Sequence, residues 1–394
     1  TTFDALSDSY AEQMRGLLEG GVDVLLIETC QDVLQAKAAI AGAETAFAEA
    51  QRRVPLMVQV TLETTGKMLV GTDMAAALVT LEAYPQIAVI GLNCATGPDQ
   101  MSEHLLYLAE HCTRKISVMP NAGLPEVVDG KTHYPLNPDG LARWLVEFVE
   151  QAGVNIVGGC CGTTPEHMAR VVQAIGRRRP VPRRPIIEAS VSSLYQSTTI
   201  RQDNSFLIVG ERTNANGSKK FRELLAAEDI DGMVRMAKEQ ARTGCHMLDV
   251  CVAYVGRDER TDMERLMTRL STEVTVPLMI DSTETEVIES ALKLTGGKCV
   301  VNSVNLEDGE KRCAEVLPLC RKFGAAVVAL TIDEEGMAKT WSRKVAVAER
   351  LYRLATEQYG LAPGDLLFDP LTFTIGTGKE DDRGGAPGLG LDQG

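Results

Sequence analysis

The chain has 394 residues, of which 44% are hydrophobic and 24% are charged. This composition is typical of a folded globular protein and excludes a disordered, collagen-like or small disulfide-rich chain. The 40 basic and 54 acidic residues give a formal charge of −14, which repels nucleic-acid phosphates and anionic lipids. We therefore expect no nucleic-acid partner.

The sequence also carries no sign of a membrane or secretory segment. No apolar stretch approaches the roughly 18 residues that a membrane span requires, and the first residues lack the pattern of a signal peptide. Ten cysteines are scattered along the chain, several of them inside apolar runs, which is typical of reduced thiols. We expect a cytoplasmic protein without membrane contact.

The first half alternates helical patterns with short apolar runs that end in polar or reactive residues. Runs of this kind, without polar alternation, are typical of parallel strands buried on both faces and connected by helices. The pattern therefore predicts an α/β domain over residues 1–175. Its five expected strands are 22–27, 54–61, 87–92, 116–119 and 154–157.

A connector and a second α/β domain follow. The Arg- and Pro-rich sequence GRRRPVPRRP predicts a helix stop and an extended linker, which we place at 176–204. The same alternation then predicts a domain over 205–378, and the Gly- and Asp-rich end, 379–394, predicts a disordered tail. The six expected strands are 206–210, 247–248, 277–280, 299–301, 325–332 and 366–368.

The reactive residues recur at the carboxyl ends of nearly all these strands. That distribution favours two (β/α)8-type barrels in tandem over doubly wound sheets, which gather their ligands at one switch point. Two closed barrels need sixteen strands, whereas five and six runs are visible. We therefore expect both barrels to be incomplete, with the chain cut at both ends.

Three cysteines follow expected strands of the first half, Cys94 in GLNC and the vicinal Cys160 and Cys161 in GGCCG. Strand ends of a barrel converge on one rim, and three thiolates with an open fourth position match a catalytic zinc site. From the spacing alone, three small buried hydrophobic residues are an equally good interpretation.

Other residues on the same rim are candidates for substrate binding. The carboxylate of Glu28 suits an ammonium group, and the free amides of the helix that follows GGCCG suit a carboxylate. Each of these residues is equally readable as a cap or a turn. The candidates are Glu28, Asn121, Gly162 and Thr163.

The strand ends of the second half carry carboxylates and carboxamides, and no cysteine or histidine cluster there indicates a metal. A ring of such groups suits a flat heterocycle with amide and amine edges, although any single Asp also suits a cap or a turn. The candidates are Glu211, Asn214, Asp249, Asp281, Asn302, Asp333 and Asp369.

The motifs GLNCATGP, MPNAGLP and GGCCGTTPEHM resemble, in order and separation, the homocysteine-binding domain of cobalamin-dependent methionine synthases and betaine-type homocysteine methyltransferases. The resemblance covers residues 1–175. It implies that the three cysteines bind zinc, that zinc takes the homocysteine sulfur, and that Glu28 helps to bind the amino acid. The opening strand of that family has no counterpart here.

The motifs VGERTNANGSKKF, PLMIDST, CVVNSVNLEDGE and LLFDPLTF resemble the pterin-binding barrel of the same methionine synthases, which is related to dihydropteroate synthase. The family's next strand, with a further Asn, has no counterpart. The resemblance implies a catalytic role for Asn302 beside that of the three cysteines. It also implies pterin contacts from Asp281, Asn302 and Asp369, with Glu211, Asn214 and Asp333 nearby.

Together the two resemblances imply methyl transfer from 5-methyltetrahydrofolate through cobalamin to zinc-bound homocysteine, forming methionine. None of the five histidines lies in the Asp-x-His-x-x-Gly pattern of a cobalamin-binding module. That module must then be supplied on a missing segment or in trans. Two alternatives stay open, a non-catalytic zinc- and pterin-binding fragment and a pterin-condensing synthase related to dihydropteroate synthase.

Overall fold

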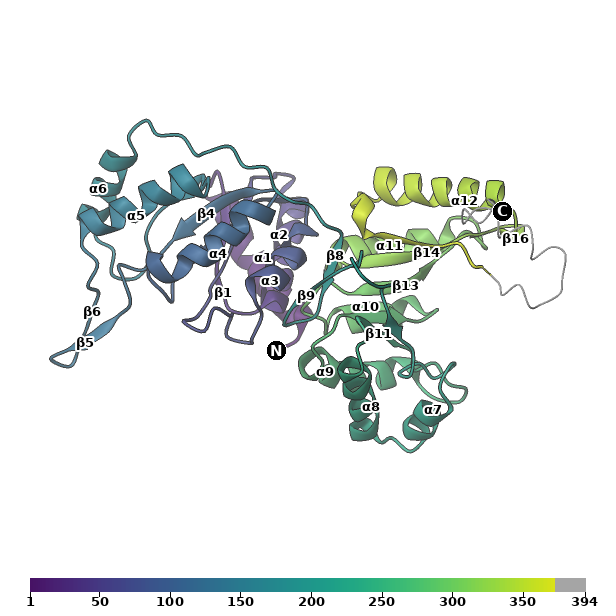
Figure 1. Cartoon of the computed structure of the whole chain (residues 1–394). Coiled ribbons are helices and arrows are strands. Elements are labelled where there is room, and N and C mark those ends of the chain that lie inside the picture. The colour runs from purple at the N-terminus through teal and green to yellow at the C-terminus, as the bar shows by residue number, and fades with distance from the viewer. Residues whose placement is uncertain (373–394) are drawn as a thin grey trace. The chain divides into compact units, whose positions relative to one another are not determined.

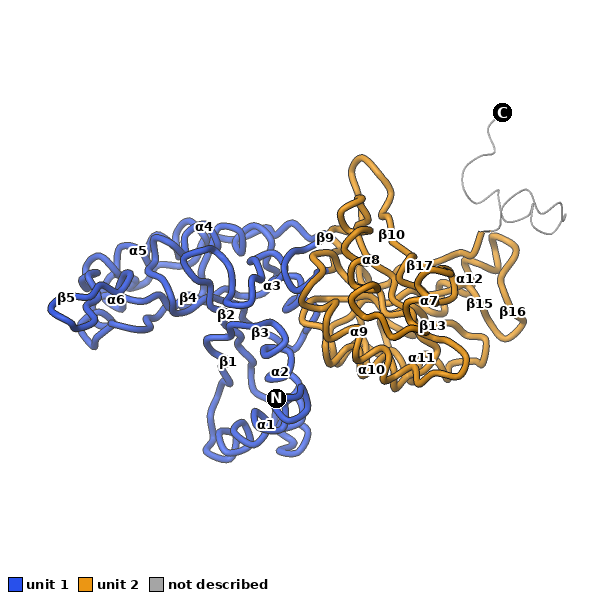
Figure 2. Tube along the Cα trace, turned by 90° about the horizontal axis from the view of Figure 1, so that it is seen from below, with its two compact units in different colours: residues 1–188, 192–197 blue, residues 189–191, 198–394 orange. Residues whose placement is uncertain are grey.

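A computed structural model describes residues 1–372, which form two compact units (Figures 1 and 2). Unit 1 comprises residues 1–188 and 192–197, and unit 2 comprises residues 189–191 and the described residues from 198 onward. The expected tail, 379–394, lies outside the described residues. The boundaries that we placed at 175 and 205 stay predictions.

Unit 1 contains one parallel sheet whose five strands follow one another in chain order. A strand overlaps each of the five expected runs of the first half, but the first one is Leu25–Cys30 and not 22–27, so Glu28 lies within it. The strands are β1 (Leu25–Cys30), β2 (Leu56–Val60), β3 (Ile87–Asn93), β4 (Lys115–Met119) and β7 (Ile156–Val157). The helices are α1 (Phe3–Glu19), α2 (Val33–Ala50), α3 (Met74–Glu82), α4 (Pro98–His111), α5 (Pro138–Gln151) and α6 (Pro165–Ile175).

The sequence explains how these elements begin and pack. Asp32 and Asp73 cap α2 and α3, because their carboxylates accept hydrogen bonds from the first free amides of each helix. Every residue of β2 is buried, as expected for a central parallel strand. Gly91 in β3 allows close strand contact, since a Cβ there would lie 2.2 Å from the carbonyl oxygen of Ser117 in β4.

Unit 2 contains a second parallel sheet, also in chain order, with a strand overlapping each of the six expected runs, although the run 325–332 holds a shorter strand than expected. The strands are β10 (Val209–Gly210), β11 (Met247–Val250), β12 (Leu278–Asp281), β13 (Val300–Val304), β14 (Ala326–Leu330) and β17 (Leu366–Asp369). The helices are α7 (Lys219–Ala226), α8 (Ile230–Arg242), α9 (Glu259–Glu273), α10 (Thr285–Leu292), α11 (Lys311–Phe323) and α12 (Trp341–Arg353). A π-helical turn (Leu354–Gln358) and a 3-10 turn (Pro363–Asp365) precede β17.

Sequential parallel order is that of a (β/α)8 barrel, because a doubly wound sheet reverses its strand order at a switch point. Within residues 1–372 both sheets are open, with β1 and β7 as the edges of one and β10 and β17 as the edges of the other. The expected class, α/β with two incomplete barrels, is confirmed. No helix among these residues is both long and apolar enough to cross a membrane.

Three two-stranded sheets were not predicted, because their strands are short and mostly polar. They are β5 (Glu126–Val128) with β6 (Lys131–His133), β8 (Ser190–Ser192) with β9 (Ser197–Thr199), and β15 (Ile332–Asp333) with β16 (Gly336–Met337). The last one corrects an expectation. The run 325–332 is not one strand ending at Asp333, since β14 ends at Leu330 and Asp333 lies in the following hairpin.

Candidate functional site

Three thiols gather at the carboxyl edge of the unit 1 sheet. Cys94 follows β3, and Cys160 and Cys161 follow β7. The Sγ atom of Cys161 lies 3.7 Å from that of Cys94 and 4.0 Å from that of Cys160, and all three atoms lie within 4.8 Å of one another. None of the three forms a disulfide. One ion can therefore contact all three sulfur atoms.

The backbone holds these thiols in place through bonds to neighbouring strand ends. Cys94 adopts a left-handed φ of 61°, a conformation uncommon outside glycine, and its amide donates to the carbonyl of Met119 at 3.1 Å. The amide of Cys160 donates to the carbonyl of Pro120 at 2.8 Å. The end of β4 thus positions both cysteine loops, and such strained residues are common at functional sites.

The electrostatics of the cluster favour a cation. Burial, together with the neighbouring Cys94, raises the pKa of the Cys160 thiol to about 12. Without a metal the Cys160 side chain is therefore favoured as the neutral thiol. A bound divalent ion displaces the thiol protons and stabilises the thiolates. Three close sulfur ligands fit the coordination chemistry of zinc, which takes thiolates among its four ligands.

Asn93 is a site residue that the sequence reasoning missed. It is fully buried at the end of β3, and its Oδ1 accepts from the amide of Thr29 at 3.0 Å. Its Nδ2 donates to Thr29 Oγ1 at 2.7 Å and lies 3.9 Å from Cys160 Sγ. Asn93 therefore ties the end of β1, with the exposed Glu28, to the cysteine loops. Its place between a buried strand and Cys94 was the available signal.

Two expected substrate-binding residues support the cysteine loop instead of pointing freely outward. The Oδ1 atom of Asn121, a buried residue, accepts from the amide of Cys161 at 3.1 Å. The hydroxyl of Thr163 donates to the carbonyl of Cys160 at 2.7 Å. Direct roles of Asn121, Thr163 and Glu28 in substrate binding stay predictions.

Tyr134, directly after β6, packs against the same loop. A Cβ on Gly162 would lie 2.2 Å from Tyr134 Cγ, and Gly162 has a φ of 79°, so this position requires glycine. Desolvation and the neighbouring Cys161 thiol raise the pKa of Tyr134. No sequence pattern indicated this contact, because the β5–β6 hairpin that precedes Tyr134 was not predicted.

In unit 2, Asn214 joins two carboxylates at the carboxyl edge of the sheet. Its Nδ2 donates to Asp249 Oδ2 at 2.6 Å and to Asp281 Oδ2 at 2.9 Å, while its Oδ1 accepts from the amide of Asn216 at 2.8 Å. Asp281 and Asn302 are register partners on β12 and β13. The structure thus brings Asn214, Asp281 and Asn302 together, as the sequence predicted.

Asp249 is the most deeply buried carboxylate of this cluster, with 3% of its surface exposed. Its Oδ2 is taken by Asn214, whereas its Oδ1 is buried without a hydrogen-bond partner in the protein. Burial, reinforced by the charge of Asp281 and opposed by the Asn214 bond, raises the pKa of Asp249 to about 6. A buried acceptor without a partner fits the N–H edge of a heterocyclic ligand.

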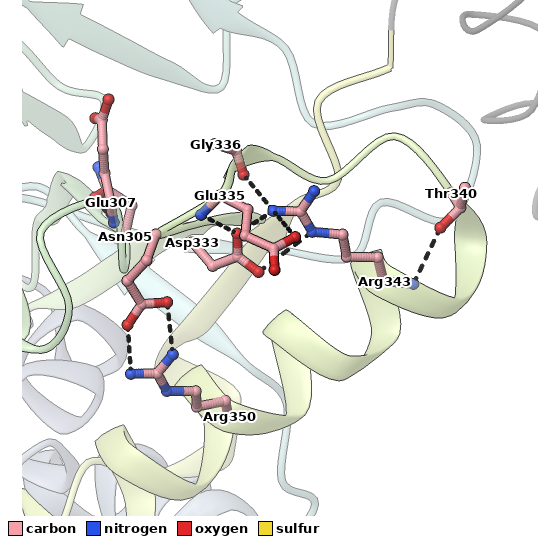
Figure 3. A network of polar contacts seen from close by, with 9 residues as sticks. Asn305, Glu307, Asp333, Glu335, Gly336, Thr340, Arg343 and Arg350 are labelled. Atoms are coloured by element: carbon pink, nitrogen blue, oxygen red, sulfur yellow. Dashed lines mark hydrogen bonds and ion pairs between the residues drawn. The ribbon is translucent and has the colours of Figure 1, made fainter.

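The remaining expected residues lie less centrally. Glu211 is exposed, and Asp369 is exposed at the end of β17, where its Oδ1 accepts from the amide of Leu371 at 2.8 Å. Asp333 forms an ion pair with Arg343 of α12, shown in Figure 3. The hydrogen bond from the Arg343 guanidinium lowers the pKa of the Asp333 carboxyl. Its carboxylate therefore anchors the β15–β16 hairpin to α12, and a pterin contact from it stays a prediction.

Comparison with known proteins assigns each half. The family model described as homocysteine S-methyltransferase matches residues 1–175, and the one described as pterin binding enzyme matches residues 210–385. The first half of the chain is thus similar to homocysteine S-methyltransferases, and the second half is similar to pterin-binding enzymes. These halves contain, respectively, the three thiols and the Asn214 cluster.

Two relatives match nearly the whole length of this chain. The chain is 50% identical to a methionine synthase of Mycobacterium tuberculosis over 386 residues and 49% identical to one of Mycobacterium leprae over 391 residues. Each alignment covers 97% of this chain but 32% of the relative. The chain therefore spans about a third of the length of these relatives.

Two solved structures are also similar to parts of the chain. One is the homocysteine methyltransferase MmuM from Escherichia coli, with 24% identity and a TM-score of 0.35 over 44% of this chain and 57% of that one. The other is a dihydropteroate synthase from Xanthomonas albilineans, with 19% identity and a TM-score of 0.37 over 50% of this chain and 70% of that one.

Proposed function

We propose that this chain supplies the homocysteine and pterin sites of a cobalamin-dependent methionine synthase. The overall reaction would move the methyl group of 5-methyltetrahydrofolate through cobalamin to homocysteine and form methionine. The observation that carries the proposal is the convergence of Cys94, Cys160 and Cys161 within 4.8 Å. The cobalamin-binding module would lie outside this chain, in cis or in trans, and the greater length of the relatives supports the arrangement in cis.

In the homocysteine domain, Cys94, Cys160 and Cys161 would hold zinc, which favours the thiolate form of a bound substrate thiol. Asn93 and Thr163 keep the two cysteine loops at fixed positions through their bonds to Thr29 and Cys160. The exposed Glu28 at the end of β1 would receive the substrate ammonium. These residues thus bind and orient the nucleophile.

In the pterin domain, Asp281 and Asn302 would present acceptor and donor groups from neighbouring strands to one edge of the pterin. Asp369 at the end of β17 would contribute a further acceptor. Asp249 lies below them, and its pKa of about 6 allows it to accept a hydrogen bond at neutral pH. These groups would hold the pterin while its methyl group leaves.

The zinc site is tested by metal analysis of three purified proteins, namely the wild type, Cys160→Ala and Cys112→Ala. Cys112 is a matched control, because it is a buried cysteine of the same unit at the end of α4. We expect one equivalent of zinc in the wild type and in the control, and a large loss in Cys160→Ala. Equal zinc in all three proteins would refute the assignment.

The pterin site is tested by calorimetric titration of 5-methyltetrahydrofolate into the wild type and Asp281→Ala. Losing a charged hydrogen-bond partner costs roughly 1.5–3 kcal/mol, so affinity should fall about tenfold or more. The exposed Asp308→Ala is the control and should bind as the wild type does. Unchanged affinity in Asp281→Ala would remove this residue from the pterin site.

A further inference from the structure

Arg312, the second residue of α11, makes an unusual set of contacts. Its guanidinium is half-buried and donates to backbone carbonyls of the loop after β12 and of strand β13. Nη2 lies 2.8 Å from the oxygen of Ser282, Nη1 lies 2.6 Å from that of Thr283, and Nε lies 3.2 Å from that of Ser303. One side chain therefore links the loop after β12 to the end of β13.

These carbonyls lie next to two expected pterin-binding residues. Ser282 directly follows Asp281, and Ser303 directly follows Asn302. Asp281 and Asn302 face each other in the strand register, and the amide of Ser282 donates to the carbonyl of Asn302 at 3.4 Å. Any displacement of the Arg312 guanidinium would therefore move Asp281 and Asn302 relative to each other.

The chemistry of arginine explains why this position needs a guanidinium. Burial lowers the pKa of Arg312, which shows that the charge is held at some cost in hydration. The partners of Arg312 are three neutral carbonyls and, at 3.5 Å, the hydroxyl of Thr285, and the positive charge of the donor strengthens these hydrogen bonds. A planar guanidinium can reach the loop after β12 and strand β13 at once, whereas the ammonium of lysine is a point charge on a flexible stem.

We propose that Arg312 is a positioning residue of the pterin site, acting through Asp281 and Asn302 by fixing the distance between the ends of their strands. This inference rests on the proposed function of unit 2. Arg312 sets the affinity for the pterin ring without touching it. A displacement of a few tenths of an ångström at two hydrogen-bonding groups is enough to weaken the binding of a rigid heterocycle.

The first experiment measures the Kd of 5-methyltetrahydrofolate by calorimetry for the wild type, Arg312→Ala and Arg312→Lys. Lys311→Ala is the control, because it removes one positive charge from an exposed neighbour on the same helix. We expect affinity to fall about tenfold in Arg312→Ala and less in Arg312→Lys, with no change in Lys311→Ala. Wild-type affinity in Arg312→Ala would overturn the inference.

A double-mutant cycle separates positioning from general destabilisation. If Arg312 acts through Asp281, the losses from Arg312→Lys and Asp281→Ala will not add, because the second change removes the group that the first one displaces. The losses from Arg312→Lys and Asp369→Ala should add, since β17 lies at the far edge of the sheet. Additive losses in both cycles would overturn the inference.

The same titrations distinguish this inference from the proposed function. A wild-type protein that does not bind the folate refutes the pterin site itself. A wild type that binds, together with an Arg312→Lys variant that binds equally well and shows no coupling to Asp281, refutes only the role of Arg312. If Arg312→Ala does not fold, the lysine variant and its two cycles still give the answer.

Discussion

Replacing Asp249 with Asn should stabilise unit 2 at neutral pH, because it removes a buried charge. The pKa of Asp249 rises from 3.8 to about 6 on folding. Between these values the folded state binds more protons than the unfolded state, so stability falls as pH rises through this window. A difference of about 2 pKa units corresponds to about 3 kcal/mol of lost stability above pH 6.

The assay is urea unfolding of the wild type and Asp249→Asn at several pH values between 4 and 8. Both proteins should carry Trp144→Phe, which leaves Trp341 of unit 2 as the only tryptophan and lets fluorescence follow that unit. We expect Asp249→Asn to be more stable by about 3 kcal/mol at pH 8, with the advantage falling to about half at pH 5 and vanishing near pH 4.

The exposed Asp308→Asn is the matched control, and it should show no such pH-dependent advantage. A constant difference between wild type and Asp249→Asn at all pH values would contradict the electrostatic reasoning, because packing changes do not titrate. The same substitution should weaken folate binding, since the amide replaces one of the two acceptor oxygens. Stability gained together with affinity lost is the expected signature of a functional buried charge.

Two further substitutions test the supports of each unit. Gly162→Ala should lower both the zinc content and the thermal midpoint of unfolding. The new Cβ would collide with the Tyr134 ring, and the φ of 79° at this position disfavours alanine. Normal zinc content in this variant would contradict the prediction. Lys298→Ala should destabilise unit 2 by about 3–5 kcal/mol in urea unfolding. The Nζ atom of Lys298 lies 2.5 Å from the buried Asp365 carboxylate, which would lose its cation. A loss below about 1 kcal/mol would show that water replaces the lysine as the partner of Asp365.

The sheets could be predicted from the sequence because each buried parallel strand is a continuous apolar run. Met57 and Val58 of β2, like Val300 and Val301 of β13, point to opposite faces of their sheet and are all buried, so apolar residues are needed at consecutive positions. The strand ends were equally visible, since polar residues follow the runs, and this placed Cys94 correctly at one edge. The three thiols were therefore found without knowledge of the fold in detail.

What the sequence could not show was the pairing of polar side chains with one another. Asn93 and Asp333 lie on strands and Arg312 lies at the start of a helix. Their partners include a threonine for Asn93, an arginine for Asp333 and three carbonyls for Arg312. Such partners depend on loop conformation, which no periodicity records. Asp333 was expected on the rim because Leu330 and Ile332 read as one run, although Thr331 separates a sheet strand from a hairpin.

Strand β7 pairs with β4 through two residue pairs, Ser117 with Ile156 and Val118 with Val157, yet the loop that follows it carries two of the three thiols. A metal bound by these thiols would link this short edge strand to the end of β3, because Cys94 and Cys161 are 67 positions apart in the sequence. Its release would free the edge to open locally while the central strands stay closed. Amide hydrogen exchange at Ile156 and Val157 would then report metal occupancy long before the unit as a whole unfolds.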